Sequence, residues 1–300
     1  MNHPIARPAT TDAMPSLLSR LLRGFRKIRQ QPDWSVFAGA NWPSRIMSEV
    51  ITDGFHAKQG RSISRWTLTA PDGQQIVVYL KRHYELPRLN GLLAILFPGR
   101  AWSPGLQEYD HLTWAEKQGL PVPRAVAAGE FVAPNGKLQG FLAVEELTGM
   151  LALHQAVPLA QTRMDARTFS KWKRSLAREL ARLARLIHDK KAFHKDLYLC
   201  HFYIHEDDTK RLPDNWANRV RVIDLHRLTR HRVTSYWWKI KDLAELAYSS
   251  EISGVTARDR LAFWRAYMGG RNNRLLARLI RWKWRMYRRH NEKLELAKHK

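Results

Sequence analysis

Residues 193–204 read FHKDLYLCHFYI, and a second stretch further along, residues 222–228, reads VIDLHRL. Each places an aspartate, Asp196 or Asp224, directly beside a run of apolar residues. An ionised carboxylate does not settle in apolar surroundings without a charged partner or a metal ion, because its desolvation is costly. Two such carboxylates close together in the sequence predict one proton acceptor and one metal ligand, the pair that phosphoryl transfer requires.

The sequence on either side of these stretches is mostly helical. A strongly amphipathic pattern from about residue 165 to residue 189 leads directly into the first stretch. The polar segment 206–218 contains a proline and predicts a loop, so the second stretch is expected as the return strand of a hairpin. Three further helices are predicted, over 236–248, 257–268 and 271–296.

The region before residue 148 has the pattern of strands instead. Strands are predicted over 62–69 and 75–81, around the turn signal APDG, and over 125–132 and 138–147, around APNGK. A helix from about residue 105 to residue 118 separates the two pairs. A strand-rich part followed by a helical part is therefore expected.

Four residues in the strand-rich part are candidates for a site. Lys81 closes the apolar run IVVYL, where a lysine either snorkels to solvent or points into a cleft to hold phosphates. Glu108 is either an ion-pair partner of Lys81 or a solvated acid favoured by the dipole of its helix. Gly60 and Arg61, within KQGRS at 58–62, mark either a loop that approaches a phosphate or a plain hairpin turn.

The composition indicates a packed globular protein. The 300 residues are 44% hydrophobic and include twelve tryptophans, enough for one large domain or two lobes. The single cysteine, Cys200, excludes a disulfide framework and a CxxC zinc site, and it fits a reducing compartment. No apolar run approaches the roughly 20 residues of a membrane span and no secretory leader is apparent, so a cytoplasmic protein is expected.

The formal net charge of +24 is expected to attract anions: nucleic acid, anionic lipid headgroups, or phosphorylated and carboxylated substrates. Nucleic acid is not expected as a partner, because no zinc site, RNA-binding aromatic signature or helix-turn-helix is recognisable. Residues 16–31, with leucines on one helical face and arginines on the other, and the basic tail 271–300 are candidates for lying on a membrane. The alternative for 16–31 is an ordinary terminal helix packed on the domain, and the alternative for 271–300 is a solvated basic helix with an aromatic core face.

The order of these features is that of a protein-kinase-like fold of the α+β class, with a strand-rich small lobe and a mainly helical large lobe. FHKDLYLCHFYI, VIDLHRL and KDLAELAYSS at 241–250 together resemble the lipopolysaccharide core kinases, the Kdo/WaaP group of sugar kinases. The resemblance is strongest over 190–270. The predicted parts are an N-terminal extension with a basic amphipathic helix at 1–45, a small ATP-binding lobe at 46–147, a large catalytic lobe at 148–270 and a basic C-terminal helix at 271–300.

The resemblance implies a role for each candidate residue. Asp196 takes the place of the catalytic-loop aspartate, which accepts or orients the proton of the attacking hydroxyl, and Asp224 that of the metal-binding aspartate. Lys81 matches the strand lysine that holds the phosphates of ATP, with Glu108 as its ion-pair partner. The remaining implied roles are a phosphate-approaching loop at Gly60 and Arg61, an adenine-reading connector from Glu145 to Leu147, and support of the catalytic loop by His194 and Asp242.

His201 departs from the protein-kinase pattern. It stands five residues after Asp196, where protein kinases place an asparagine that binds a second metal ion. Histidine is usual there in the lipopolysaccharide kinase family, although an imidazole is a poorer ligand for Mg²⁺ than an amide oxygen. His201 is therefore a candidate metal ligand, substrate contact or structural residue.

The function that the resemblance implies is ATP- and Mg²⁺-dependent phosphorylation of a heptose or Kdo sugar in the lipopolysaccharide inner core. The acceptor would be a lipid A–core glycolipid, which places the protein peripherally at the cytoplasmic face of the inner membrane. Its positive charge would also suit an acidic carrier protein. The alternatives are a kinase for a protein or a small polyol, or an inactive kinase-like binding scaffold, against which the presence of Asp196, Asp224 and Lys81 argues.

Overall fold

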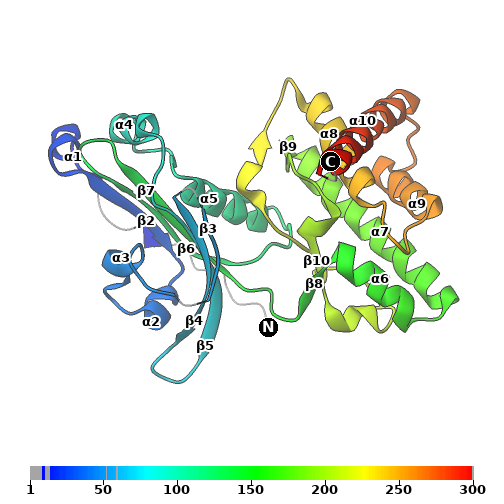
Figure 1. The fold of residues 1–300 in the computed structure, drawn as a ribbon, viewed down its shortest axis with the longest axis horizontal. Coiled ribbons are helices and arrows are strands. Elements are labelled where there is room, and N and C mark those ends of the chain that lie inside the picture. Colours follow the sequence, from blue (N-terminus) through cyan, green and yellow to red (C-terminus); the bar gives the residue numbers. More distant parts are fainter. Residues whose placement is uncertain (1–8, 11–13, 52, 59, 299–300) are drawn as a thin grey trace. The chain divides into compact units, whose positions relative to one another are not determined.

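The computed structural model describes residues 9–10, 14–51, 53–58 and 60–298. The chain divides into two compact units (Figure 1). The strand-rich unit comprises the chain up to Trp114 together with Pro123–Leu147, and the helical unit comprises Ala115–Val122 together with everything from Thr148 on. One unit is built on an antiparallel sheet and the other mainly on helices, which confirms the predicted α+β class.

The strand-rich unit holds a seven-stranded antiparallel sheet in the order β1-β2-β6-β7-β5-β4-β3. The strands are β1 (Ala9–Thr10), β2 (Phe25–Gln30), β3 (Gly54–Lys58), β4 (Arg61–Thr69), β5 (Gln75–His83), β6 (Ala125–Val132) and β7 (Leu138–Glu145). The two predicted hairpins are β4–β5 and β6–β7, and β5 joins them by pairing with β7. Val78 and Leu80 of β5 are fully buried, so strand alternation turns Lys81 to the opposite face of the sheet.

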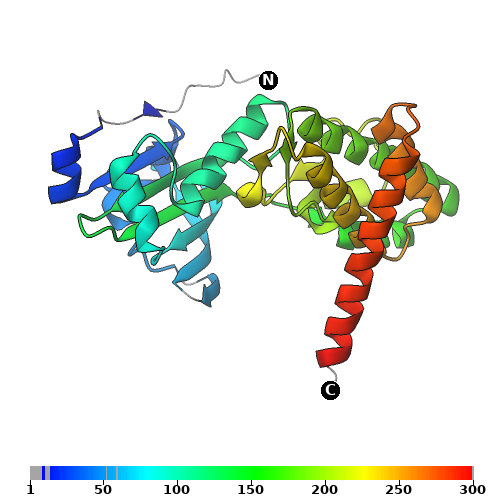
Figure 2. The ribbon, with the colours of Figure 1, turned by 90° about the horizontal axis from the view of Figure 1, so that it is seen from above.

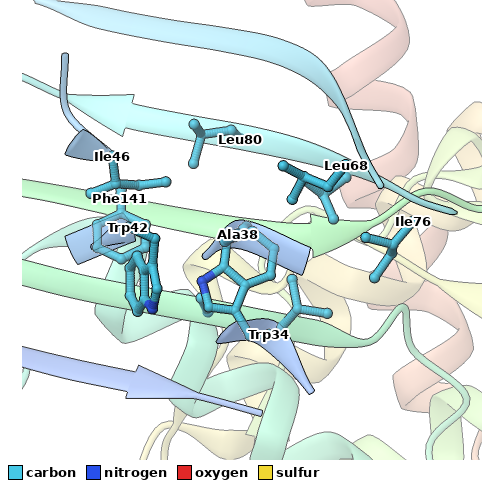
Figure 3. Packing of buried hydrophobic residues seen from close by; sticks show 12 residues of the cluster. Trp34, Ala38, Trp42, Ile46, Leu68, Ile76, Leu80 and Phe141 are labelled. Carbon is cyan, nitrogen blue, oxygen red and sulfur yellow. The ribbon is translucent and has the colours of Figure 1, made fainter. Parts of the chain in front are cut away.

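The face of the sheet that carries Val78 and Leu80 is covered by two short helices, α2 (Trp34–Ala38) and α3 (Trp42–Arg45). Trp34 and Trp42 meet edge to face with their ring centroids 5.9 Å apart, and Trp42 lies 5.6 Å from Phe141 of β7 (Figure 3). Edge-to-face aromatic pairs contribute beyond their buried area. Through these aromatic contacts the segment before residue 46 packs on the sheet.

The prediction of one helix over 16–31 is wrong, because the chain changes from helix to strand within this segment. The helix α1 covers only Leu17–Arg23, and Gly24 follows it with a φ of 69°. A Cβ at Gly24 would lie 2.2 Å from the carbonyl oxygen of Val132, so only glycine fits this approach to β6. The chain then continues as β2, which pairs with β6 along its whole length. The described residues before 46 are therefore part of the sheet unit rather than an extension from it, and residues 1–8 and 11–13 lie outside the described residues.

Two helices follow β5 in the strand-rich unit, α4 (Arg88–Leu96) and α5 (Pro104–Lys117), whose last turn belongs to the helical unit. The first was not expected from the sequence, whereas the second matches the helix predicted over 105–118. Gly91 lets α4 sit directly on the turn between β6 and β7, because a Cβ there would lie 2.0 Å from the carbonyl oxygen of Gly136. The helix α5 positions Glu108.

The helical unit contains five long helices among its described residues and two small sheets. The helices are α6 (Leu153–Arg163), α7 (Ala166–Asp189), α8 (Ser235–Ser249), α9 (Ala257–Met268) and α10 (Arg274–Lys298). The sheets are β11 (Arg221–Val222), β10 (Phe202–His205) and β8 (Met150–Ala152), and a pair of β12 (Thr229–Arg230) with β9 (Ala192–Phe193). The pairing of β10 with β11 is the predicted hairpin around the polar loop.

The basic C-terminal helix α10 packs on α8 through its first turns. Leu276 and Ile280 are buried, and the hydroxyl of Tyr287 reaches Glu245 of α8 at 3.3 Å, while Trp282 is half exposed. The last turns of α10 extend past the other helices of the unit (Figure 2). None of the helices in the described part of the chain is long and apolar enough to cross a membrane.

Candidate active site

In the strand-rich unit, Lys81 and Glu108 form the ion pair that the sequence predicts. The Nζ atom of Lys81 lies 2.8 Å from Oε1 of Glu108. The side chain of Glu108 is only 7% exposed and that of Lys81 is 27% exposed. The ammonium group therefore points at a buried carboxylate instead of snorkelling to open water, which fixes its position at the end of β5.

The other candidates of this unit lie in the turn between β3 and β4 and at the end of β7. Gly60 has a φ of 72° in the turn between β3 and β4, beside Arg61 at the start of β4, and Gln59 lies outside the described residues. The connector residue Glu145 ends β7 and donates its backbone N–H to the carbonyl of Arg124 at 2.9 Å. Leu147 is the last residue of the strand-rich unit.

In the helical unit, one buried side chain holds the backbone of the first aspartate stretch. Asp242 of α8 is fully buried and accepts the backbone N–H groups of His194 and Lys195, both at 2.9 Å. His188 Nε2 lies 3.2 Å from the same carboxylate, and its Nδ1 is 2.8 Å from the hydroxyl of Tyr267. Several donors on one buried carboxylate offset the cost of burying its charge. These are the contacts that a supporting role requires.

The same face of α8 carries two more acceptors for this loop. Glu245 accepts the backbone N–H of Leu197 at 3.3 Å, and the Ser249 hydroxyl oxygen accepts that of Leu199 at 2.8 Å. Burial raises the pKa of Glu245, whereas its contact with Lys241 acts in the opposite direction. Residues 242, 245 and 249 follow helical spacing, so α8 presents a stripe of acceptors, the α8 stripe, along the loop.

Asp196 stands out of this loop between two cations. Nη1 of Arg227 donates to both of its carboxylate oxygens, at 2.8 and 2.9 Å, and Nζ of Lys241 lies 3.9 Å away. The Asp196 side chain keeps 19% exposure and that of Arg227 keeps 50%. The preceding residue, Lys195, has a φ of 67°, a conformation that non-glycine residues hold only when surrounding contacts enforce it. The loop thus presents a carboxylate to solvent in a fixed place.

Asp224 also has an unusual backbone and is flanked by two histidines. Its φ of 62° and ψ of 52° are left-handed, and it directly precedes a 3₁₀ turn, Leu225–Arg227. His226 Nδ1 lies 2.6 Å from Oδ1, and His201 Nε2 lies 3.6 Å from Oδ2. The turn after Asp224 is what brings Arg227 to Asp196, so the two aspartate stretches form one site.

His201 links the two stretches. Its Nδ1 lies 2.7 Å from the carbonyl oxygen of Asp196, and its ring stacks on that of His194 at 5.5 Å. Burial alone lowers the pKa of His201, but hydrogen bonds to Cys200 and the Asp196 carbonyl and the charge of Asp224 outweigh it and raise the pKa to about 9. Both ring nitrogens face oxygen acceptors of the site, because Nδ1 lies beside the Asp196 carbonyl and Nε2 lies 3.6 Å from Asp224 Oδ2. This geometry favours a hydrogen-bonding role for His201 over metal ligation.

His194 provides a second link between the stretches. It is fully buried, and its Nε2 lies 3.0 Å from the carbonyl oxygen of Ile223, the residue before Asp224. Burial lowers the pKa of His194, so the ring is neutral and its Nε2–H is the donor to this carbonyl.

The protein supplies few oxygen ligands for a cation. Among the described residues, no three His, Cys, Asp or Glu side chains gather closely enough to hold a metal ion by themselves. Asp224 is a partly exposed carboxylate at the site, and it offers hard oxygen donors. This donor set fits a cation such as Mg²⁺ that is bound through one or two carboxylates together with substrate phosphates and water.

Comparison with known proteins agrees with this geometry. The model of the lipopolysaccharide kinase (Kdo/WaaP) family matches residues 103–267, more than half of the chain. The chain belongs to this family. The matched region contains Glu108 and every candidate of the helical unit, whereas Lys81 precedes it.

The curated relatives are named as kinases of the lipopolysaccharide core. The lipopolysaccharide core heptose(I) kinase WaaP of Pseudomonas aeruginosa is 32% identical over 161 residues, which cover 54% of this chain and 58% of that protein. The protein of the same name from Escherichia coli K12 is 32% identical over 152 residues, covering 50% and 55%. The chain thus matches little more than half the length of these relatives.

A solved structure extends the likeness to most of the fold. The structure titled "WaaP in complex with acyl carrier protein" is 25% identical and has a TM-score of 0.65. The match covers 88% of this chain and 98% of the other. It confirms the predicted kinase-like fold with a strand-rich and a helical lobe.

The structure also brings residues into the site that were not among the sequence candidates: His188, His226, Arg227, Lys241, Glu245 and Ser249. Lys241 and Glu245 flank Asp242 within KDLAEL, so their spacing on one helix face was available as a signal. Arg227 follows Asp224 by three residues, but its contact with Asp196 depends on the left-handed turn, which the sequence does not reveal.

Proposed function

We propose that this protein is an ATP-dependent kinase that phosphorylates a sugar hydroxyl, of a heptose or Kdo, in the lipopolysaccharide inner core. The observation that carries the proposal is the presentation of Asp196 by a loop held along the α8 stripe, within the region that matches the family. The curated relatives are named as heptose(I) kinases, which favours heptose as the acceptor sugar.

Asp196 would receive the proton of the attacking hydroxyl. A general base must lie within hydrogen-bond reach of that proton, and Asp196 is the carboxylate that the loop leaves accessible. Both of its oxygens accept a hydrogen bond from Arg227, so an incoming hydroxyl would replace Arg227 as the donor to one of these oxygens. The displaced guanidinium stays next to the reacting hydroxyl, where a cation stabilises the charge of the transferred phosphoryl group.

The phosphates of ATP would be held by Lys81, which Glu108 orients, and by a divalent cation on Asp224. We expect Mg²⁺, because the available protein donors are carboxylate oxygens. Such a cation would supply positive charge beside the phosphates. Asp224 would hold it, and contacts with His201 and His226 orient the Asp224 carboxylate.

Adenine recognition would fall to the connector. The N–H groups of Glu145 and Glu146 already donate to the carbonyls of Arg124 and Val77, at 2.9 and 2.8 Å. The connector carbonyls and the N–H of Leu147 are then the groups that would read adenine. Gly60 and Arg61 would approach the phosphates from the β3–β4 turn.

We also propose an acidic carrier protein as a partner. A net charge of +24 attracts an acidic protein, and a structurally similar protein has been solved in complex with acyl carrier protein. The helical unit contains a largely apolar cavity of about 600 Å³, lined by side chains of α7, α8, α9 and α10 such as Leu176, Leu246, Phe263 and Ile280. Such a lining suits an acyl chain better than a nucleotide or a sugar.

The acceptor would be a lipid A–core glycolipid, which is anchored in a membrane. We therefore propose that the protein works peripherally at the cytoplasmic face of the inner membrane. The sequence has a single cysteine, Cys200, which fits a reducing compartment.

Mass spectrometry of the acceptor tests this function. Purified protein is incubated with ATP, Mg²⁺ and lipid A–core glycolipids that either contain or lack inner-core heptose. We expect a mass gain of one phosphate on the heptose-containing glycolipid only. A gain on neither glycolipid, with casein or a polyol phosphorylated in its place, would assign the kinase fold to another acceptor class.

A further inference from the structure

The strand-rich unit exposes an apolar surface that its own fold does not explain. Eight of the nineteen exposed large hydrophobic side chains in the described chain come from α1 and the α4 segment. The two helices contact one another at one end of the sheet (Figure 1). We call this surface the leucine patch; its members are Leu17, Leu18, Leu21, Leu22, Leu89, Leu92, Leu96 and Phe97.

The helix α4 is apolar on both of its faces. Gly91, Ala94 and Ile95 are buried against the sheet unit. On the outer face Leu89 is 64% exposed and Leu96 is 53% exposed, where a surface helix normally carries polar residues. The helix α1 likewise buries none of its residues, although four of its seven are leucine. Both helices therefore present apolar faces that the protein itself does not cover.

The chemistry around the patch identifies what covers it. Residues 14–30 carry five Lys or Arg and residues 86–107 carry two, and neither segment contains an Asp or Glu. Arg23, Arg26, Arg88 and Arg100 are exposed. Arg29, also in the first segment, is instead paired with Asp110 of α5 at 2.6 Å. Leucines framed by exposed arginines match the boundary of an anionic bilayer, where leucines enter the acyl region and arginines meet lipid phosphates.

We propose that the leucine patch is the surface by which this protein docks on anionic membrane. This deepens the proposed function, because it rests on a membrane-anchored acceptor and names the surface that reaches it. The patch combines a helix predicted from the sequence as a membrane candidate with one that the sequence did not predict. The other membrane candidate, α10, instead uses its first turns to pack on α8.

Vesicle flotation tests the proposal. Full-length protein is mixed with vesicles of phosphatidylethanolamine and phosphatidylglycerol, or of phosphatidylcholine alone. We expect binding to the anionic vesicles, and a loss of at least about tenfold in partition coefficient for Leu18→Gln/Leu22→Gln/Leu92→Gln/Leu96→Gln, because membrane affinity scales with the apolar area inserted. Arg23→Gln/Arg26→Gln should weaken binding to anionic vesicles several-fold.

Leu212→Gln/Leu275→Gln is the control, since both leucines are exposed but lie in the helical unit. It should bind as the parent protein does. Equal flotation of the parent and the four-leucine variant would overturn the proposal, as would loss of binding in the control alone. So would a dimer in lipid-free sedimentation that the four-leucine variant dissociates, because the patch would then be a contact between two copies.

The test separates this proposal from the proposed function. Flotation requires no ATP, so Asp196→Asn should float as the parent protein does. Conversely, the four-leucine variant should phosphorylate a detergent-dispersed acceptor at the parental rate, because none of the substituted side chains contributes to the candidate active site. If the four-leucine variant loses that activity and its circular dichroism spectrum shows that it is unfolded, Arg23→Gln/Arg26→Gln becomes the deciding variant, because it leaves the apolar surface intact. Unchanged flotation of this arginine variant would then overturn the proposal.

Discussion

At the scale of single residues, the contact between Arg227 and Asp196 is the feature that separates this site from a generic pair of carboxylates. The guanidinium covers both oxygens of the proposed base and is itself half exposed, so it can move when a hydroxyl arrives. Arginine presents a planar fork of donors that lysine cannot reproduce. The two cations beside the Asp196 carboxylate, Arg227 and Lys241, come from segments other than the catalytic loop.

Replacing Arg227 should therefore impair transfer. We expect Arg227→Ala to lower kcat by about 10- to 100-fold, with KM for ATP nearly unchanged, because the lost cation acts on the transferred group. Arg227→Lys should recover part of the rate. Steady-state kinetics measure both, and Arg232→Ala, which removes the same charge from an exposed neighbouring position, is the control. An Arg227→Ala enzyme as fast as the parent would show that this contact has no part in transfer.

His83 makes the strand-rich unit sensitive to acid. Burial, together with the charges of Arg61 and Lys81, lowers the pKa of His83 to about 4, and its buried Nδ1 has no hydrogen-bond partner among the described residues. The unfolded chain binds a proton near pH 6.5, whereas the folded chain binds it only near pH 4. Stability contributed by neutral His83 is thus present above pH 6.5 and is lost as the pH falls toward 4.

His83→Gln should reduce this loss. Because the side chain keeps some solvent contact, we expect on the order of 1–2 kcal/mol less destabilisation between pH 7 and pH 4.5 in the variant. Urea unfolding of both proteins at the two pH values measures the difference. Parallel pH profiles for the two proteins would mean that His83 titrates normally in the fold.

At the scale of elements, the α8 stripe is what turns a short apolar loop into a fixed site. Its acceptors Asp242, Glu245 and Ser249 bind four backbone N–H groups between residues 194 and 199. Because the three acceptors are held by one helix, they fix the path of the loop backbone. A loop without such acceptors would leave buried donors unsatisfied, at a cost of about 1–3 kcal/mol each. The position of Asp196 therefore depends on α8.

Asp242→Asn tests that dependence. An amide presents only one acceptor oxygen to the N–H groups of His194 and Lys195, so we expect the free energy of unfolding to fall by roughly 2–4 kcal/mol and kcat to fall with it. Chemical denaturation and steady-state kinetics provide the two readouts. Asp189→Asn, an equivalent change at a 68% exposed side chain, should alter neither.

The elements also show what a sequence can and cannot predict. The strand over 125–132 and the helix over 257–268 have the predicted bounds, because turn signals and caps delimit them. The segment 25–30 was predicted as helix because its apolar residues continue the spacing of α1; pairing with β6 overrides that local preference. The helix α4 was not predicted because leucines on both faces erase the polar-apolar alternation.

The candidate site likewise contains residues that the sequence predicts and residues that it does not. Asp196, Asp224, Lys81 and Glu108 were selected from motif and position, and the ion pair between the last two is present in the structure. The partners that hold Asp196 and Asp224 were not selected. They depend on left-handed turns and on contacts between residues distant in sequence, and one sequence does not specify either.

At the scale of the whole molecule, part of the net charge of +24 is concentrated at particular places in the structure. Exposed arginines frame the leucine patch, arginines and lysines run along α10, and cations flank Asp196. An anionic glycolipid in an anionic membrane would meet a positive protein at each of these places. Because exposed charges are screened within about 8 Å at physiological salt, these surfaces act locally and not as one field.

Membrane association should accordingly depend on salt, and phosphorylation of a detergent-dispersed acceptor should depend on it less. We expect flotation with anionic vesicles to weaken several-fold between low salt and about 0.5 M salt, while the leucine contribution persists. Phosphorylation of a detergent-dispersed acceptor, measured over the same salt range, is the comparison. Equal salt sensitivity of the two would place electrostatic attraction at the active site instead of at the docking surface.

The most direct test of the account is transfer of the labelled γ-phosphate of ATP to purified heptose-containing lipid A–core by the parent protein and by Asp196→Asn. Asparagine preserves the size of the side chain but removes the basic carboxylate. We predict labelled glycolipid with the parent protein, and a rate at least about 100-fold lower with the variant, whose circular dichroism and ATP binding are unchanged. Equal labelling by the two proteins would contradict the role given to Asp196 and the mechanism built on it.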